Sequence, residues 1–215
     1  MTYYSENDIY ALMQRAPYLR LSNKGLNSLL KETLAGGDAY GQYFAQYPAG
    51  RIKPLDFLYQ CRYNLDALDE HLLRDLLQAT WREANWGAWL ALLAPRPEYE
   101  ALLLEIRGRH PYGQDILELA IAAHSGVVPA HLGEQHSSAL RVRTMVESLQ
   151  RQPRALRKNP GPSQQDAYQA ELDAVRAAYR SGGAASALPL TRKGLLGYYG
   201  EDYWAWAARQ SAPNR

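Results

Sequence analysis

The sequence is poor in cysteine and has no long apolar run. Cys61 is the single cysteine among 215 residues, so the chain cannot form an internal disulfide. We expect this thiol to fill a small apolar space in a helix. No run reaches the roughly 20 apolar residues that a membrane helix needs, and the first 20 residues carry Glu6, Asp8, Arg15 and Arg20. The sequence therefore predicts no membrane span, no signal peptide and a cytoplasmic location.

Sequence motifs of catalysis are also missing. The chain contains no GxSxG, HExxH, CxxC, P-loop or glycine-rich dinucleotide turn. His110-Pro111-Tyr112 resembles the opening of the Fic adenylyltransferase motif, but the phosphate-binding half of that motif does not follow. His124, His131 and His136 have spacings of seven and five residues, which match no standard set of metal ligands. We predict no enzymatic activity, no metal site and no cofactor.

The segment from Thr80 to Ala94, TWREANWGAWLALLA, is the one around which we expect the fold to be built. Thr80 and Glu83 have the spacing of a capping box, which marks a helix start. No charge follows Glu83 until Arg96. On a helical wheel, tryptophans and leucines fill one half and glycine and alanines fill the other. A helix that is apolar all round, and too short to cross a membrane, is predicted to be the central helix of an all-α protein.

Apolar residues recur at helical spacing through the rest of the chain, and no strand is predicted. The clearest amphipathic helix should present Glu70, His71, Arg74 and Asp75 on its outer face. About ten helices with short connections fit either a HEAT-like stack of hairpins or an irregular helical bundle. The predicted helices cover residues 5–16, 23–36, 38–47, 65–79, 80–94, 98–107, 114–124, 137–150, 163–180 and 191–210, together with one that begins at Pro54.

We expect the whole chain, residues 1–215, to form one helical domain. Two loops would divide it into N-terminal helices (1–50), a central stack (51–151) and C-terminal helices (163–215). The second loop, residues 152–162, is basic and rich in proline, which is typical of an exposed linker.

Two charged segments are candidates for binding. Between Asp56 and Asp75, five carboxylates outweigh Arg62 and Arg74. Such an acidic face confers solubility, and it would also suit a basic partner. The second segment, residues 141–158, is basic, which fits either contacts to phosphates or a solvated linker, and it has no aromatic residue to stack on bases. Its cations are Arg141, Arg143, Arg151, Arg154, Arg157 and Lys158, against Glu147 alone.

The central segment also carries a resemblance. Trp81-Arg82-Glu83, then Trp86, Ala88-Trp89 and Leu92, preceded by a leucine-rich helix, resembles uncharacterised bacterial families of small HEAT-like repeat proteins. Several of these families are similar to immunity proteins encoded beside polymorphic or secreted antibacterial toxins. The likeness covers residues 65–123, and it implies a binding protein without catalytic residues.

We therefore predict a non-enzymatic immunity protein that binds one cognate toxin molecule and blocks it. Sixteen tyrosines and five tryptophans against two phenylalanines favour a protein interface, because aromatic side chains with a polar tip suit one. The first alternative is an adaptor that binds nucleic acid through residues 141–158. The second is an enzyme with a histidine-based site, which would need a deep polar pocket where His110 or His124 meets carboxylates. The residues predicted to contact the toxin are Asp66, Asp69, Glu70, Arg74 and Asp75.

Overall fold

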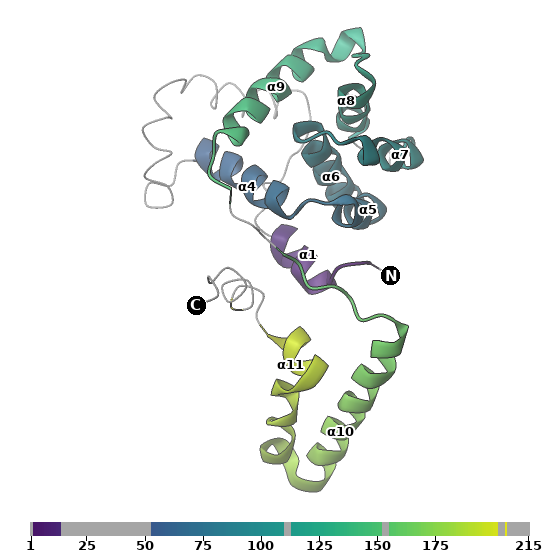
Figure 1. The fold of residues 1–215 in the computed structure, drawn as a ribbon, viewed down its shortest axis with the longest axis vertical. Helices are drawn as coiled ribbons and strands as arrows, with labels where there is room; N and C mark the ends of the chain where they lie inside the picture. Colours follow the sequence, from purple (N-terminus) through teal and green to yellow (C-terminus); the bar gives the residue numbers. More distant parts are fainter. Residues whose placement is uncertain (1, 14–52, 110–112, 152–154, 202–204, 206–215) are drawn as a thin grey trace. The chain divides into compact units, whose positions relative to one another are not determined.

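Figure 1 shows the fold of the computed structural model, which describes residues 2–13, 53–109, 113–151, 155–201 and 205. These residues form helices joined by turns and contain no strand, so the predicted all-α class is confirmed. The chain divides into a central unit, residues 12–153, and a C-terminal unit, which combines residues 1–11 with 154–215. The helices predicted over 23–36 and 38–47 lie outside the described residues.

In the central unit, α6 occupies the middle, as the sequence predicts. It contacts α4, α5, α8 and α9, and every residue from Ala84 to Leu93 is buried. Burial on all sides explains why this segment has no charge after its first turn. The elements of this unit are α4 (Lys53–Ala67), α5 (Glu70–Gln78), α6 (Trp81–Leu93), α7 (Pro97–Glu105), α8 (Gln114–Ser125), the 3-10 turn η2 (Ala130–Leu132) and α9 (Gly133–Glu147).

The four helices α5 to α8 form two stacked hairpins. Within each hairpin the two helices are in contact, α5 with α6 and α7 with α8. Between the hairpins, α5 contacts α7 and α6 contacts α8, which is the neighbour pattern of helical-hairpin repeats. The helix that follows departs from this pattern, because α9 packs against α4 and α6.

The glycine and alanine side of α6 receives α5 at close range. A Cβ atom added to Gly87 would lie 3.1 Å from Cβ of Leu76 and 3.4 Å from Cδ1 of Leu73. The leucines of α5 therefore occupy the space that a side chain at position 87 would need. Figure 1 shows these two helices adjacent within the central unit.

One predicted helix, residues 65–79, is wrong in its bounds. α4 continues to Ala67 and α5 begins only at Glu70. The carboxylate of Asp69 accepts a hydrogen bond from the Leu72 amide at 2.8 Å, so Asp69 caps a new helix. Both helices bury leucines, so the amphipathic spacing of the leucines continues across this break. The spacing alone therefore does not reveal where one helix ends and the next begins.

Two other helix starts also differ in detail from the sequence prediction. Thr80 is the N-cap of α6, but its hydroxyl donates to the Glu83 carboxylate, and no backbone capping box forms. The α9 helix begins at Gly133, before the predicted start at residue 137. The turn η2 after Pro129 leads directly into it, so the predicted loop is shorter.

The C-terminal unit is built around a hairpin. Its elements are the start of α1 (Glu6–Met13), α10 (Pro162–Ala187), the 3-10 turn η3 (Leu190–Arg192) and α11 (Gly194–Gly200). α10 packs against η3 and α11. The backbone of Gly183, with φ 65° and ψ −161°, interrupts α10 near its end. The predicted end of this helix at residue 180 is therefore early, and the segment from 181 remains helical on both sides of the glycine.

Among the described helices, none alone has the length and apolar character to cross a membrane. One bent pair, Gln114–Ser125 with Ala130–Glu147, meets the criterion of length and composition only when its two parts are taken together, and they are bent by 104°.

Replacing Gly87 with leucine should destabilise the chain, because the new side chain would overlap Leu73 and Leu76. Overpacking of this kind costs about 1 to 3 kcal/mol. Gly133→Ala is the matched control, since no atom lies within 4 Å of its Cβ position and its φ of −60° is helical. Urea denaturation should show a lower midpoint for G87L and an unchanged or higher one for G133A. Equal midpoints for G87L and the wild type would contradict the close approach of α5.

Candidate functional site

The predicted toxin-contacting residues do not lie on one helix face. Asp66 belongs to α4, where it forms an ion pair with Arg62, and the two side chains are 4% and 9% exposed. Asp75 lies on α5 but is only 7% exposed. The expectation that Asp75 occupies an outer face, and that one helix carries the whole acidic surface, is therefore wrong. The helix break at Asp69 places Asp66 and Asp75 on different helices, and Asp75 lies among the buried residues of α5, next to Leu76.

The other three predicted residues belong to α5, with Asp69 and Glu70 at its start and Arg74 one turn later. Asp69 caps the helix, and Glu70 forms an ion pair with Arg74 at 3.1 Å, with both side chains close to half exposed. An exposed pair of this kind contributes little to stability, at most about 1 kcal/mol. Its carboxylate and guanidinium groups remain accessible to a partner.

Tyr99 shows that a further carboxylate joins this group. Burial raises the pKa of Tyr99 to about 12; Arg96 acts to lower it, and the charges of Glu98, Asp69 and Glu70 act to raise it. The Tyr99 hydroxyl donates to the Leu68 carbonyl at 3.4 Å, so it lies beside the loop that precedes α5. We call Asp69, Glu70 and Glu98 the acidic corner. Asp69 caps α5, Glu70 begins it and Glu98 lies in the first turn of α7, and these two helices are in contact.

Cys61 lies in α4 and is fully buried, which confirms the predicted apolar environment. Burial raises the pKa of the Cys61 thiol to about 12. A thiol is nucleophilic only as the thiolate, so this side chain does not supply a nucleophile near neutral pH.

The histidines of the central unit that the structure describes occupy separate elements. In α8, Nδ1 of His124 lies 2.8 Å from the Ala120 carbonyl oxygen and Nε2 lies 3.1 Å from the Arg96 carbonyl oxygen. His131 lies in η2 and His136 in α9. Within the described ranges, no three His, Cys, Asp or Glu side chains are placed to hold a metal ion. The His110-Pro111-Tyr112 motif lies outside those ranges.

The basic segment 141–158 is divided between the two units at Pro153. Arg143 forms an ion pair with Glu147 at 2.8 Å. Arg157 is 1% exposed, so the prediction of a solvated linker is wrong at this residue. Arg154 lies outside the described residues. Arg143 and Arg157, which were candidates for binding phosphates, are therefore engaged within the chain.

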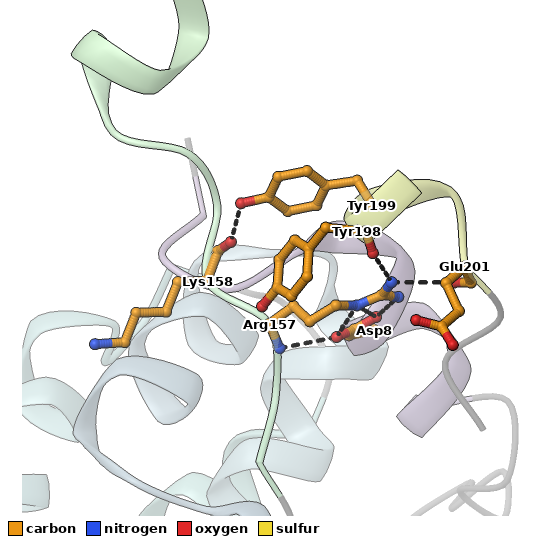
Figure 2. A network of polar contacts seen from close by, with 6 residues as sticks. All are labelled: Asp8, Arg157, Lys158, Tyr198, Tyr199 and Glu201. Carbon is orange, nitrogen blue, oxygen red and sulfur yellow. Dashed lines mark hydrogen bonds and ion pairs between the residues drawn. The ribbon is translucent and has the colours of Figure 1, made fainter. Parts of the chain in front are cut away.

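Figure 2 shows the cluster that holds Arg157. Its guanidinium forms a buried ion pair with Asp8, in which Nε lies 3.0 Å from both carboxylate oxygens. The terminal nitrogen Nη2 also contacts Asp8. The terminal nitrogen Nη1 donates to the carbonyl groups of Tyr198 at 2.7 Å and Glu201 at 3.0 Å. The hydrogen bond with Asp8 is the main reason that the pKa of Arg157 is raised, so the guanidinium stays charged. We call this cluster the Arg157 clamp.

Backbone contacts surround the clamp. The Ser5 amide donates to the Arg157 carbonyl at 2.7 Å, and the Asn159 amide donates to the Tyr3 carbonyl at 2.9 Å. The Tyr199 hydroxyl donates to the Lys158 carbonyl at 2.5 Å, as Figure 2 shows. Residues from both ends of the chain thus meet around one guanidinium. Because the chain's own carboxylate and carbonyl groups occupy that guanidinium, we assign the clamp a structural role.

A cavity of about 690 Å³ lies along η3 and α11 in the C-terminal unit. The amides at the start of α11 do not offer it an anion site, because the Glu171 carboxylate accepts hydrogen bonds from Leu195 and Leu196. The lining carries opposite charges and three glycines, a mixture that selects no particular class of ligand. The lining residues are Thr191, Arg192, Gly194, Gly197, Tyr198, Gly200 and Glu201.

Comparison of the chain with models of protein families, with curated proteins and with solved structures found no match. The resemblance to immunity proteins through Trp81-Arg82-Glu83, Trp86 and Ala88-Trp89 stays a prediction.

Removing the negative charge of the Arg157 clamp should destabilise the C-terminal unit strongly. Asp8→Asn leaves the Arg157 charge buried without its counter-ion, which costs about 3 to 5 kcal/mol for a pair of this kind. Hydrogen exchange should therefore accelerate in α11, because Tyr198 and the C-cap residue Glu201 supply the two carbonyl groups. Glu147→Gln, which removes an exposed ion pair in the central unit, is the control and should leave exchange in α11 unchanged. Normal protection of α11 in D8N would show that the unit does not depend on the clamp.

Cys61 should resist thiol reagents while the chain is folded. With a pKa of about 12, only about one thiol in ten thousand is ionised at pH 8, and burial blocks access as well. Labelling by a disulfide reagent should be slow in buffer and complete in urea, and it should speed up as the pH rises toward 12. Rapid labelling of the native chain at pH 8 would contradict the buried position.

Proposed function

We propose that this chain is a non-enzymatic immunity protein, which binds a cognate antibacterial toxin one to one and blocks its active site. The acidic corner, formed by Asp69, Glu70 and Glu98, is the observation that carries the proposal. It replaces the wider set of predicted contact residues, because the Asp66 and Asp75 side chains are buried.

The corner has the properties of a rigid electrostatic contact. Its carboxylates belong to two helices that pack against each other, so their spacing is fixed by the fold. Glu98 is exposed and Glu70 is about half exposed, and both reach solvent. Toxins that act on nucleotides or nucleic acids need cationic residues to hold phosphates. An acidic surface is complementary to such a site, and complementary charge accelerates association.

Two cations beside the corner would give the contact an orientation. Arg74 pairs with Glu70, and the Arg96 guanidinium lies 5.6 Å from the centre of the Tyr99 ring. A surface with both signs in a fixed pattern rejects partners in which like charges would meet. The combination suits one specific basic partner better than basic proteins in general.

Exposed tyrosines in the C-terminal unit support a protein as the partner. Tyr10 is 66% exposed and Tyr179 is 62% exposed. Tyr3 and Tyr198 are each 37% exposed. Tyrosine is enriched in protein interfaces because it combines a large apolar area with a polar tip. This unit therefore offers a second region for contacts with the toxin.

The proposal is tested by binding to the product of the reading frame that neighbours this gene, with its catalytic residues replaced. Co-expression of the chain should also protect cells from the active form of that protein. Failure of both binding and protection would reject the immunity role. Success of either without the other would reject the blocking mechanism.

Reversing charge at the corner should slow association with that toxin by about tenfold at low salt, because steering by charge is lost. The test variant is Glu70→Lys with Glu98→Lys. The control is Asp115→Lys with Glu134→Lys, which removes exposed carboxylates from the first turns of α8 and α9 and changes the net charge equally. Association rates measured across a salt series should separate the two pairs. Equal slowing in both would reject the corner as the contact surface.

A further inference from the structure

Among the residues of the C-terminal unit that the structure describes, none covers the outer face of α10. Among its side chains from Gln164 onward, only Ala187 is buried. Tyr168, Leu172 and Val175 lie half-buried on the side that meets η3 and α11. The solvent-exposed part of α10 is mostly polar and charged, with Asp166, Gln169, Arg176 and Tyr179 among its exposed residues, and one stripe within it consists of small exposed residues: Ala170, Ala174, Ala177 and Ser181.

The exposed residues follow the spacing by which two helices pack along one seam. They recur at intervals of four, three and four residues, which is the a and d pattern of a heptad. Alanine and serine side chains are short, so a second helix can approach to the near end of the 8 to 10 Å range between helix axes. The regular part of α10 ends at Gly183, just after the last residue of this seam.

Charges along one edge of the seam specify what can dock there. Asp173 and Arg180 lie on the same edge, one heptad apart, and both are exposed. If two copies of α10 paired in parallel, Asp173 and Arg180 of each would face Ala178 and Ala185 of the other, since g positions face e positions, and the two charges would not meet. If they paired antiparallel, Asp173 of each copy would face Arg180 of the other. The edge is therefore complementary to itself in one orientation only.

We propose that this face binds a second copy of the chain in an antiparallel α10–α10 pair. The two-fold axis passes between Val175 and Arg176, so that Ala174 meets Ala177 and Ala170 meets Ser181 of the second copy. Each carboxylate of Asp173, which already accepts from Arg176 at 2.9 Å, gains a second guanidinium from Arg180 across the axis. The interface is isologous, as in most homodimers, and its small side chains make it weak and dependent on concentration. It does not rest on the proposed toxin-binding function.

Sedimentation equilibrium of the full chain tests the pair. The wild-type mass should rise with concentration from 24.2 kDa toward twice that value. Ala174→Glu with Ala177→Glu should hold the mass at one chain, because carboxylates would meet in the seam. Ala185→Glu lies on the same helix beyond Gly183 and should behave as the wild type. A wild-type mass of one chain at every concentration would overturn the proposal. A loss of self-association in A185E as large as that in the A174E/A177E variant would overturn it as well.

A charge exchange tests the orientation. Asp173→Arg and Arg180→Asp should each weaken self-association by about tenfold or more, because like charges would then meet across the axis. When the two variants are mixed, the two guanidinium groups of one chain face the two carboxylates of the other. Heterodimers should therefore form with the wild-type affinity to within about threefold. Helical circular dichroism should be unchanged in both. A mixture that remains monomeric would refute the antiparallel register, since interactions inside one chain cannot respond to mixing.

Discussion

The approach of α5 to the small side of α6 is the contact on which the central unit depends. Three leucines of α5 lie 3.1 to 3.5 Å from the position that a Cβ atom at residue 87 would take. That approach leaves α6 without a solvent face, so the helix must bury all ten residues from Ala84 to Leu93. Its other contacts, with α8 and α9, complete the enclosure. The stacking of two hairpins follows, because α6 forms one hairpin with α5 and contacts α8, which forms the other hairpin with α7.

The sequence predicted this part of the fold well because its information is local. Helical periodicity, Pro97 at the start of α7 and the glycines on either side of α8 mark elements within a few residues of their observed bounds. Where the prediction of bounds is wrong, the pattern is local but ambiguous. Leucine spacing runs through the break at Asp69, since α4 and α5 both turn apolar residues inward. Only the capping carboxylate signals a new helix there, and a lone aspartate is a weak signal.

The candidate sites were harder to predict because charge alone does not tell where a side chain lies. Asp75 has the helical spacing of an exposed residue and is buried, and Arg157 has the sequence context of a linker and is buried as well. The partner of Arg157 is Asp8, which is 149 residues away in sequence. No periodicity connects residues at such a distance. The contribution of Glu98 to the acidic corner was missed for the same reason, since it arises from the contact of α5 with α7.

The two proposed surfaces lie in different units and use different physics. Attraction at the acidic corner acts over about 8 to 10 Å in physiological salt and governs the rate of encounter. The α10 seam acts only at contact, where alanine side chains allow two backbones to approach. A symmetric pair of chains would carry two acidic corners, so the stoichiometry with a monomeric toxin stays one to one per chain. Pairing would then add affinity only toward a toxin that is itself multimeric, because only such a partner can engage both corners at once.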